Sequence, residues 1–591
     1  MLTAEPKAYG SNWYAATRVD GSARPGLTIE LDVEVCVIGA GLAGLTVARE
    51  VARLGRSVVV LEAKSVAWSA SGRNTGVVLP GFAVSADALI ERVGLDAAKA
   101  LWARSEAGAE YVRTAARDMP GVGLNEGGWL HVSKTDDIRP LAHEAALLAG
   151  EFGAAVEPWP VDRVREALHS PRYFHGLHYP RGFSLHPLNY AHGLAAVAEA
   201  SGARIFEDTP VLEIDPDGVR KRVITSHSRV RAAHIVLAGN VHLAELVPQF
   251  SRTLLPIFST VVTTAPLGDQ LLDSIRYPGA VSDDTDLAGH HHRVIEGRRL
   301  MWCGRSSVRL GKPHREGEAL VRRIRRTYPA LRNVKVEHAW IGVAGHTVHG
   351  MPQLGEITPG LWLLSGFGGH GINTAAMGGE MLARAIVDND RSWQMFSPFA
   401  LVWAGGAFGR AAQPLVGWSH RTREAVEGVL ARRRDAKRRR AEAAKAAPAA
   451  AAPPATTFAA PAIEPVAEPI AAMEPAPVAP AAALPATTFA EPAIEPVAEP
   501  IMAAMEPALA AIEAPAPGPS EHQSAGAGAP IPNEQVAPVP PKRPKRGPKK
   551  KKSAPPQPLK DLFESASGTE AAAGPPDGSG VVRPPLPDEK I

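Results

Sequence analysis

The sequence predicts an α/β protein with a long disordered C-terminal tail, and three observations support this prediction. A short apolar run at 33–38 leads into a glycine-rich turn and then into a helix pattern. A second apolar run at 361–364 leads into another glycine-rich turn and another helix pattern. Beyond residue 440 the aromatic residues almost disappear, and alanine and proline dominate. The chain therefore divides into a folded part and a tail with too few apolar residues to bury a core.

The first glycine-rich turn has the spacing of a dinucleotide-binding fingerprint. Gly39 suits a tight turn, Gly41 allows a pyrophosphate to approach the backbone, and Gly44 allows the helix to pack on the strand. The helix that follows offers free N–H groups and its positive dipole end to that phosphate. Glu62 ends the next strand, where a carboxylate can accept hydrogen bonds from the ribose hydroxyls. We interpret this unit as a Rossmann-like nucleotide-binding domain, with a purely structural glycine turn as the alternative.

Composition narrows the class of protein further. The two cysteines, Cys36 and Cys303, give no disulfide framework. No run of about eighteen apolar residues marks a membrane-spanning helix, and the N-terminus lacks the pattern of a signal peptide. We therefore predict a cytoplasmic protein, with association to a membrane surface left open. Two basic clusters, 432–440 and 542–552, contribute to the net charge of +3, so this charge says little about the folded part.

The segment from Ala63 to Phe82 combines small residues with one arginine and several hydroxyl groups. A loop of this composition can run close to a flat polar cofactor, with Ser71 and Arg73 available to its phosphates. A solvated surface loop explains the same composition equally well.

These motifs, together with Ser69–Gly76, resemble the flavin-dependent D-amino-acid oxidase / glycine oxidase superfamily. The segments 70–82 and 12–16 are most similar to gamma-glutamylputrescine oxidases and related amine oxidases, although Thr75 stands where those usually carry glycine. The resemblance covers about residues 12–421 and implies FAD, bound noncovalently because 340–355 lacks the cysteine to which sarcosine oxidases attach their flavin. It implies that the cofactor is contacted by Gly39, Gly41, Leu42, Ala43, Gly44, Glu62, Ala63, Ser71, Gly72, Arg73, Asn74, Thr75, Gly76, Val211, Gly239, Gly366, Gly368, Gly369, His370, Gly371 and Ile372.

The second glycine-rich turn, Gly366–Asn373, opens a helix whose apolar residues recur at spacings of three and four. Reduction of a flavin leaves negative charge at N1 and the C2 carbonyl, and a helix N-terminus can stabilise that charge with fixed dipoles. The resemblance implies this position for Gly368–Ile372. A glycine turn needed only for packing is the alternative.

Two residues are predicted to act on the substrate, Arg293 and His370. Relatives that oxidise amino acids hold the carboxylate with an arginine of the substrate-domain sheet, and Arg293 stands near the matching place. The preceding His290–His292 departs from the tyrosines of the putrescine branch, which leaves the substrate open. Three consecutive strand residues cannot all face one ion, so we predict no metal site. We expect a solvated hairpin edge, with two alternating histidines that face the same cavity as the alternative. His346 and His349 are expected to line the flavin or to be structural.

The predicted organisation has five parts. An N-terminal arm (1–31) precedes a discontinuous FAD-binding domain (32–84, 183–255 and 340–390), and a mixed-sheet substrate domain is formed by 85–182 and 256–339. A helical extension (391–430) leads to a disordered Ala/Pro-rich and basic tail (431–591), at whose start the basic run 432–440 is expected to prolong a helix.

The tail contains a duplicated segment, 454–470 and 485–501, in which frequent prolines favour an extended chain. Its basic run 542–552 can contact nucleic acid or an anionic membrane. Simple solvation of a disordered tail is the other interpretation.

We therefore predict an FAD-dependent oxidoreductase that oxidises a C–N bond of an amine or amino acid, such as a gamma-glutamylputrescine-like or other secondary amine. Hydride transfer to the flavin would give an imine that water hydrolyses. The expected partners are a small-molecule amine or amino acid and, as electron acceptor, dioxygen or a quinone. Two alternatives remain: a D-amino-acid dehydrogenase that passes electrons to a quinone, and a tethering protein that acts through its tail and keeps an idle flavin domain.

Overall fold

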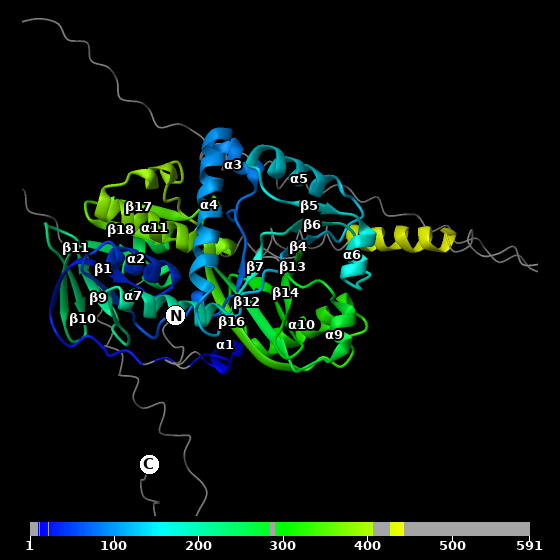
Figure 1. Ribbon diagram of the computed structural model, residues 1–591, viewed down its shortest axis with the longest axis horizontal. Helices are drawn as coiled ribbons and strands as arrows, with labels where there is room; N and C mark the ends of the chain where they lie inside the picture. Colours follow the sequence, from blue (N-terminus) through cyan, green and yellow to red (C-terminus); the bar gives the residue numbers. More distant parts are fainter. Residues whose placement is uncertain are drawn as a thin grey trace, which may run out of the picture. The chain divides into compact units, whose positions relative to one another are not determined.

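The computed structural model describes residues 10, 12–19, 21, 23–244, 246–283, 290–405 and 426–442. All of them belong to one compact unit of the chain, Met1–Phe458. Two large sheets dominate this unit, and helix α4 (Leu95–Ala116) runs between them in the view of Figure 1. This architecture confirms the predicted α/β class. The predicted disordered tail falls, from residue 443 onward, outside the described residues.

The first sheet has eight strands and carries the fingerprint. Its central strands β18, β11, β1, β2 and β8 are parallel in that order, β17 lies antiparallel at one edge, and β10 and β9 extend β11. All four residues of β2 are buried, as expected for a strand covered on both faces. The strands are β1 (Leu31–Ile38), β2 (Val58–Leu61), β8 (Arg204–Phe206), β9 (Val211–Asp215), β10 (Lys221–Thr225), β11 (Arg229–Leu237), β17 (Gln353–Thr358) and β18 (Leu361–Ser365).

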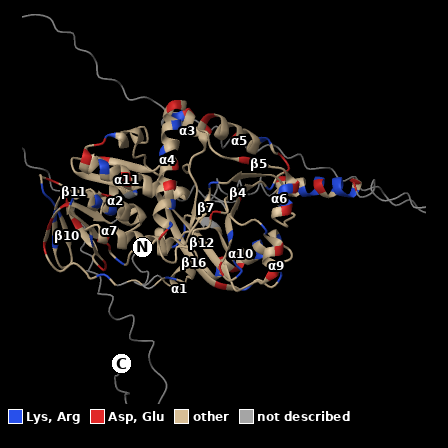
Figure 2. Ribbon diagram, viewed as in Figure 1, with Lys and Arg blue, Asp and Glu red and all other residues tan. Residues whose placement is uncertain are grey.

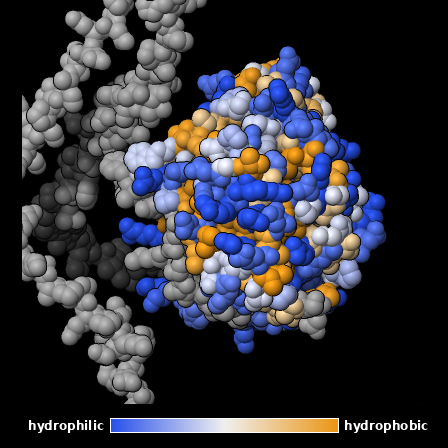
Figure 3. Space-filling model, turned by 90° about the vertical axis from the view of Figure 1, so that its left-hand side faces the viewer, coloured by the Kyte–Doolittle hydropathy of each residue, from blue (hydrophilic) through white to orange (hydrophobic). Residues whose placement is uncertain are grey.

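Helices pack closely on this sheet because small residues line their contacts. Helix α2 (Leu42–Arg53) lies against α7 (Pro187–Ala200) and α11 (Gly371–Asp388). A Cβ on Gly379 of α11 would lie 2.6 Å from the Cβ of Thr46 on α2, so the glycine sets the approach of these two helices. The outer surface at this end of the unit mixes hydrophilic and hydrophobic side chains (Figure 3), which is the normal state of a protein surface.

The second sheet also has eight strands, in the order β16-β12-β15-β14-β13-β4-β6-β5, with only β13 and β4 parallel. Helix α10 (Pro313–Thr327) covers one of its faces, and a separate hydrophobic core fills the space between them. The strands are β4 (Trp129–Val132), β5 (Glu157–Trp159), β6 (Gly176–Tyr179), β12 (Leu255–Thr264), β13 (Ala280–Asp283), β14 (His290–Ile295), β15 (Arg299–Ser307) and β16 (Val336–His346).

Short elements complete the unit. A two-stranded ribbon joins β3 (Val77–Val78) to β7 (Phe183–Ser184). The remaining helices and 3-10 turns are α1 (Trp13–Ala16), α3 (Ala86–Val93), α5 (Arg139–Phe152), α6 (Val161–Ala167), α8 (Pro248–Ser251), α9 (Asp269–Ser274), η1 (Ala70–Gly72), η2 (Asn240–Ala244), η3 (Gly368–His370) and η4 (Ser392–Phe396).

The structure differs from the predicted boundaries at two places. Strand β16 pairs with β12 along its whole length, so a domain boundary at residue 340 would divide one strand. Residues 431–442, placed at the start of the disordered tail, are helical and continue a helix described from residue 426. Within the predicted extension 391–430, the described residues form η4 and the start of that helix, while 406–425 lie outside the described residues.

Ion pairs attach the helix 426–442 to the part of the unit that contains the second sheet. Both guanidinium nitrogens of Arg165 on α6 meet the Asp435 carboxylate, at 3.2 and 3.0 Å. Arg434 pairs with Asp136 at 2.9 and 2.6 Å. Basic side chains mark this helix in Figure 2. Among the helices that the structure describes, none is long and apolar enough to span a membrane.

Candidate functional site

The first glycine-rich turn has the geometry that its spacing predicts. Gly39 follows β1 with a φ of 106°, in the region that favours glycine. A Cβ on Gly44 would lie 2.0 Å from the Gly39 carbonyl oxygen, which shows how closely α2 packs on the turn. Gly41 is the N-cap of α2 and supplies no side-chain hydrogen bond. The positive end of this helix is therefore presented to the turn without a side-chain cap of its own.

Glu62 lies beside this turn at the end of β2. Its two carboxylate oxygens accept hydrogen bonds from the N–H groups of Ala40 (2.8 Å) and Lys64 (2.9 Å), and the N–H of Ala63 also acts on it. Burial raises the pKa of Glu62, while these backbone hydrogen bonds act in the opposite direction. Each oxygen retains a further lone pair, so the carboxylate can also accept from a ribose hydroxyl.

The loop after β2 is held by its own polar groups. Ser71 Oγ accepts from the N–H of Leu42, the first residue of α2, at 3.0 Å. Asn74 closes the loop, because its Nδ2 donates to the carbonyls of Ala70 and Ser71, and its Oδ1 accepts from the N–H of Gly76 at 2.7 Å. The loop is thus tied to the start of the helix rather than free in solvent.

Arg73 joins the same loop to the second sheet. Its Nε donates to the Trp68 carbonyl at 2.9 Å, and its guanidinium lies 4.8 Å from the centre of the Trp68 ring. Its own carbonyl accepts from the Trp340 indole N–H at 2.9 Å. These contacts hold Arg73 against its own loop and β16, and the phosphate contact predicted for Arg73 stays a prediction.

The other predicted cofactor residues lie where the backbone is tight. A Cβ on Gly72 would lie 2.4 Å from the Ala67 carbonyl oxygen, and one on Gly239 would lie 2.9 Å from the Leu243 side chain. Val211 is half-buried and begins β9.

The second glycine-rich turn leads into α11 through η3. Gly366 and Gly368 have φ values of 71° and 57°, so both need glycine. Gly369 has open space beside it, since a Cβ there would meet no atom within 4 Å. Gly371 and Ile372 form the uncapped start of α11. The turn thus presents a second uncapped helix start.

His370 ends this turn and faces the loop after β3. Its Nδ1 lies 3.4 Å from the Leu79 carbonyl oxygen. Burial, with a smaller contribution from the nearby His291, lowers the pKa of His370 to about 4 against the opposing effect of the Leu79 carbonyl. The imidazole is therefore neutral near neutral pH. Because a carbonyl can only accept, Nδ1 carries the proton and Nε2 is left as an acceptor.

Arg293 is buried between the second sheet and the loop after β2. Its Nε donates to the Thr75 carbonyl at 3.0 Å, and its terminal nitrogens donate to Ser184 Oγ (3.3 Å) and the Leu185 carbonyl (3.1 Å). These contacts hold the loop against the ribbon of β3 and β7. They favour a positioning role, whereas the predicted contact with a substrate carboxylate stays a prediction.

The three histidines of β14 do not form a solvated edge. His292 is stacked on Trp302 with ring centres 4.2 Å apart, and its Nε2 lies 2.8 Å from the Tyr328 hydroxyl. Trp302 donates its indole N–H to His290 Nδ1 at 3.1 Å. Both histidines are buried on the face covered by α10, which we call the outer face. His291 alternates to the opposite face, so the expected solvated hairpin edge is wrong for the buried pair.

The inner face of the second sheet is the face that turns toward the first sheet, and it carries a row of polar side chains. Strand register places His131, Ser282 and His291 directly opposite one another on β4, β13 and β14, and Cys303 continues the row on β15. His131 Nδ1 lies 3.2 Å from Ser282 Oγ. We call His131, Ser282 and His291 the polar row. It lies near His370, because His291 acts on the pKa of that residue.

Sequence reasoning missed His131 and Ser282, because no motif marks them and only strand register brings them together. Two buried side-chain atoms outside both glycine-rich turns are also candidates for a contact with a ligand. Asn240 Oδ1 and His346 Nε2 have no hydrogen-bond partner within the described part of the chain. Fourteen buried side-chain atoms of the described residues lack such a partner; these two lie beside Gly239 and at the end of β16, so they fit a site that a polar ligand completes. No cluster of metal-binding side chains occurs among the described residues.

Comparisons with known proteins agree with this geometry. The model of the family DAO, described as FAD dependent oxidoreductase, matches residues 34–385. A probable oxidoreductase OrdL of Haemophilus influenzae is 29% identical over 412 residues, covering 67% of this chain and 92% of its own length. The gamma-glutamylputrescine oxidoreductase of Escherichia coli is 27% identical over 392 residues, covering 66% and 91%. The crystal structure of glycine oxidase from Geobacillus kaustophilus shares the fold, with a TM-score of 0.53 at 19% identity over 63% of this chain and 99% of that one.

Proposed function

Because the chain belongs to the DAO family of FAD dependent oxidoreductases, we propose that it oxidises the C–N bond of an amine of the gamma-glutamylputrescine type. The chain is an FAD-dependent oxidoreductase that acts on the CH–NH or CH–NH2 group of an amine or amino acid. The proposal adds that the substrate is an amine with a second polar group.

The described residues fit FAD. The start of α2 has no side-chain cap from its own N-cap residue Gly41, the Glu62 carboxylate keeps acceptor capacity for ribose, and Asn240 and His346 each offer a buried atom without a partner among the described residues. When bound, FAD supplies the acceptor for the hydride that leaves the carbon beside the amine nitrogen, and water then hydrolyses the imine.

The observation that carries the proposal is the polar row opposite His370. A neutral His370 with a bare Nε2 can accept the N–H of an amine and so orient the adjacent C–H bond. His131, Ser282 and His291 can then hydrogen-bond a second polar group of the substrate. Arg293 already donates to three groups of the chain, which favours an amine over a substrate held by its carboxylate.

The test is an anaerobic absorbance titration of the purified full chain with secondary amines, gamma-glutamyl amines and D-amino acids. We expect the flavin bands to bleach with the gamma-glutamyl amine and far more slowly with D-amino acids. Bleaching by D-amino acids alone would contradict the proposal and favour the dehydrogenase alternative. Admission of air then distinguishes dioxygen, which restores the bands, from a quinone, which must be added.

Variants of the polar row locate the substrate. Ser282→Ala and His291→Phe are expected to raise KM for the amine at least about tenfold, while His292→Phe on the outer face leaves KM unchanged. Equal effects of His291→Phe and His292→Phe would place the substrate elsewhere. A cytoplasmic location, a tail that tethers, and contacts of the tail with nucleic acid or a membrane stay predictions.

A further inference from the structure

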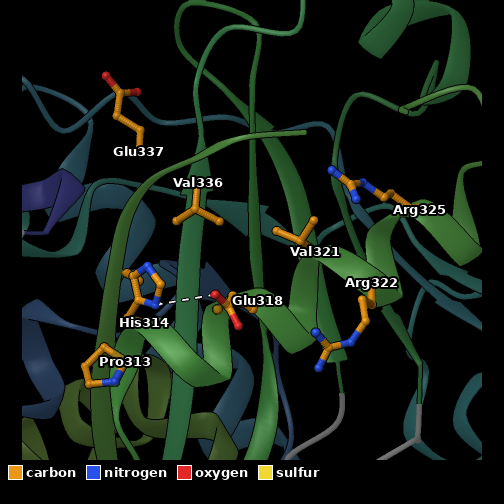
Figure 4. Close-up of a pocket in the computed structure, with 10 residues that line it drawn as sticks. Pro313, His314, Glu318, Val321, Arg322, Arg325, Val336 and Glu337 are labelled. Carbon is orange, nitrogen blue, oxygen red and sulfur yellow. Dashed lines mark ion pairs between the residues drawn. The ribbon is translucent and has the colours of Figure 1, made fainter. Parts of the chain in front are cut away.

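A groove of about 760 Å³ lies on the outer face of the second sheet, away from both glycine-rich turns. It is bounded by helix α10 on one side and the first residues of β16 on the other (Figure 4). Val321 and Val336 lie on opposite walls of the groove (Figure 4), and Ala339 also lines it. Val336 keeps 36% of its surface exposed. The groove therefore offers an apolar floor of the size that side chains of a bound ligand can fill.

One wall of the groove is an edge strand. β16 is the terminal strand of the second sheet and pairs on one side with β12, and no described strand pairs with its first residues on the other side. An edge strand directs unpaired N–H and C=O groups outward, which makes it a template for an added strand. A helix beside such an edge, with a groove between them, is the arrangement that accepts an extended peptide by strand addition.

The rim of the groove is basic. Arg322 and Arg325 lie on the groove side of α10, and both are exposed. Arg325 donates to the Val334 carbonyl at 3.3 Å, whereas Arg322 makes no ion pair within the part of the chain that the structure describes. The exposed acids nearby are already paired, Glu318 with His314 (3.7 Å) and Glu337 with Arg299 (2.7 Å).

The basic character extends over the surrounding surface, where exposed basic residues occur along α10 and in the turn into β16. The exposed cations of this region are Lys312, Arg315, Arg322, Arg325, Arg326, Arg332 and Lys335. Such a surface attracts an acidic partner and repels a second copy of itself, because two copies joined at this edge would bring the same cations together.

We propose that this groove and the edge of β16 bind an extended, acidic segment of a partner protein, which adds a strand to the second sheet. Its backbone pairs with Val336 and the residues after it. Its apolar side chains enter the groove over Val321 and Ala339, and its carboxylates meet Arg322 and Arg325. This site is separate from the polar row and does not depend on the proposed substrate.

The test uses the full chain with FAD and a fluorescein-labelled peptide made of three Glu-Glu-Val-Val repeats, which places both residue types on both faces of a strand. Binding is followed by fluorescence anisotropy at low and at raised salt. A Lys-Lys-Val-Val peptide and a peptide with proline at alternate positions serve as controls. We expect the acidic peptide to bind, the binding to weaken with salt, and neither control to bind.

Arg322→Glu is the decisive variant, because the loss of an exposed side chain without an ion pair leaves the fold intact. We expect at least tenfold weaker binding, and the same for Val336→Pro, which removes one edge N–H. Arg332→Glu is the matched control, since it makes the same change of charge outside the groove. It is expected to change binding less than twofold. The basic run 542–552 is common to all variants, so differences between them report on the groove.

A photoreactive residue in the peptide gives an independent location, and cross-links are expected on α10 and β16. Three results would overturn the proposal: equal binding of the lysine peptide, equal weakening by Arg322→Glu and Arg332→Glu, or a dimer seen in sedimentation that Val336→Pro abolishes. The first two would show simple charge attraction, and the third would show that a second copy covers the edge.

Discussion

The two faces of the second sheet use neighbouring residues for opposite purposes. On the outer face, Asp283, His290 and His292 are sealed under α10 with Trp302. On the inner face, Ser282 and His291 lie on the side that turns toward the first sheet. Neighbours along one strand therefore belong to different environments, because strand side chains alternate with a period of two. A cluster in the sequence is a cluster in space only if the secondary structure makes it one.

Exchange of the buried carboxylate on the outer face should have the largest effect. Asp283 meets Lys134 at 3.2 Å and Arg323 at 3.3 Å while only 2% exposed. Burial raises its pKa, but these two cations outweigh burial and hold the pKa below its usual range. Asp283→Asn would remove the buried negative charge with which both cations pair, so we expect a loss of about 3–5 kcal/mol in the free energy of unfolding, measured with urea.

Its neighbour Ser282 is the control for that experiment. Ser282→Ala should cost less than about 1 kcal/mol and act on KM instead, because its hydroxyl meets His131 in the polar row. Similar losses of stability from both variants would show that the two faces do not differ in the way described.

Acid should weaken the whole folded unit, because several histidines are buried in the neutral form. Burial lowers the pKa to about 3 for His292 and to about 4 for His186, His346 and His370. The unfolded chain takes up protons below its ordinary histidine pKa near 6.5, while the folded chain resists them. The free energy of unfolding is therefore highest above about pH 6.5. It falls as the pH falls toward 4, by at most about 3 kcal/mol per histidine.

Urea titrations at intervals between pH 7.5 and 4 measure this loss. Replacement of His292 by phenylalanine removes one titrating group, so the slope of stability against pH should become shallower than in the unchanged chain. A slope that this variant leaves unaltered would show that His292 is not buried in the neutral form.

The features that sequence could predict are those that depend on near neighbours. Gly39, Gly44 and Glu62 lie within one strand–helix–strand unit, so their spacing alone indicates the nucleotide site. Arg293 was singled out correctly as a residue of the second sheet, yet its partner Thr75 is 218 positions away in the chain. The polar row needs the register of three strands, which no local pattern contains.

Arg293 tests whether an inner-face residue can be structural. Arg293→Met would leave the carbonyls of Thr75 and Leu185 without their donors, so we expect a loss of about 2–3 kcal/mol in the free energy of unfolding. The loop after β2 would also loosen, and the purified protein should retain less FAD, measured by absorbance after denaturation. Arg293→Lys should recover only part of both, because an ammonium cannot reproduce the three-point fork. A rise in KM with unchanged stability and FAD content would instead favour the predicted contact with a substrate carboxylate.

The smallest expected change separates the two faces most cleanly, because it uses the same substitution on adjacent residues. His292→Phe keeps the stacking on Trp302 and loses only the hydrogen bond to Tyr328, so it should cost about 1 kcal/mol of unfolding free energy and leave KM unaltered. His291 lies half-buried on the inner face, outside the packing under α10, so His291→Phe should change stability by less than about 0.5 kcal/mol while raising KM. Urea unfolding and steady-state kinetics on the two variants, side by side, measure both quantities. If the two exchanges moved stability and KM together, the alternation of β14 would not separate packing from substrate binding. If His292→Phe changed only stability and His291→Phe changed only KM, β14 would be shown to support the fold with one residue and to contact the substrate with the next.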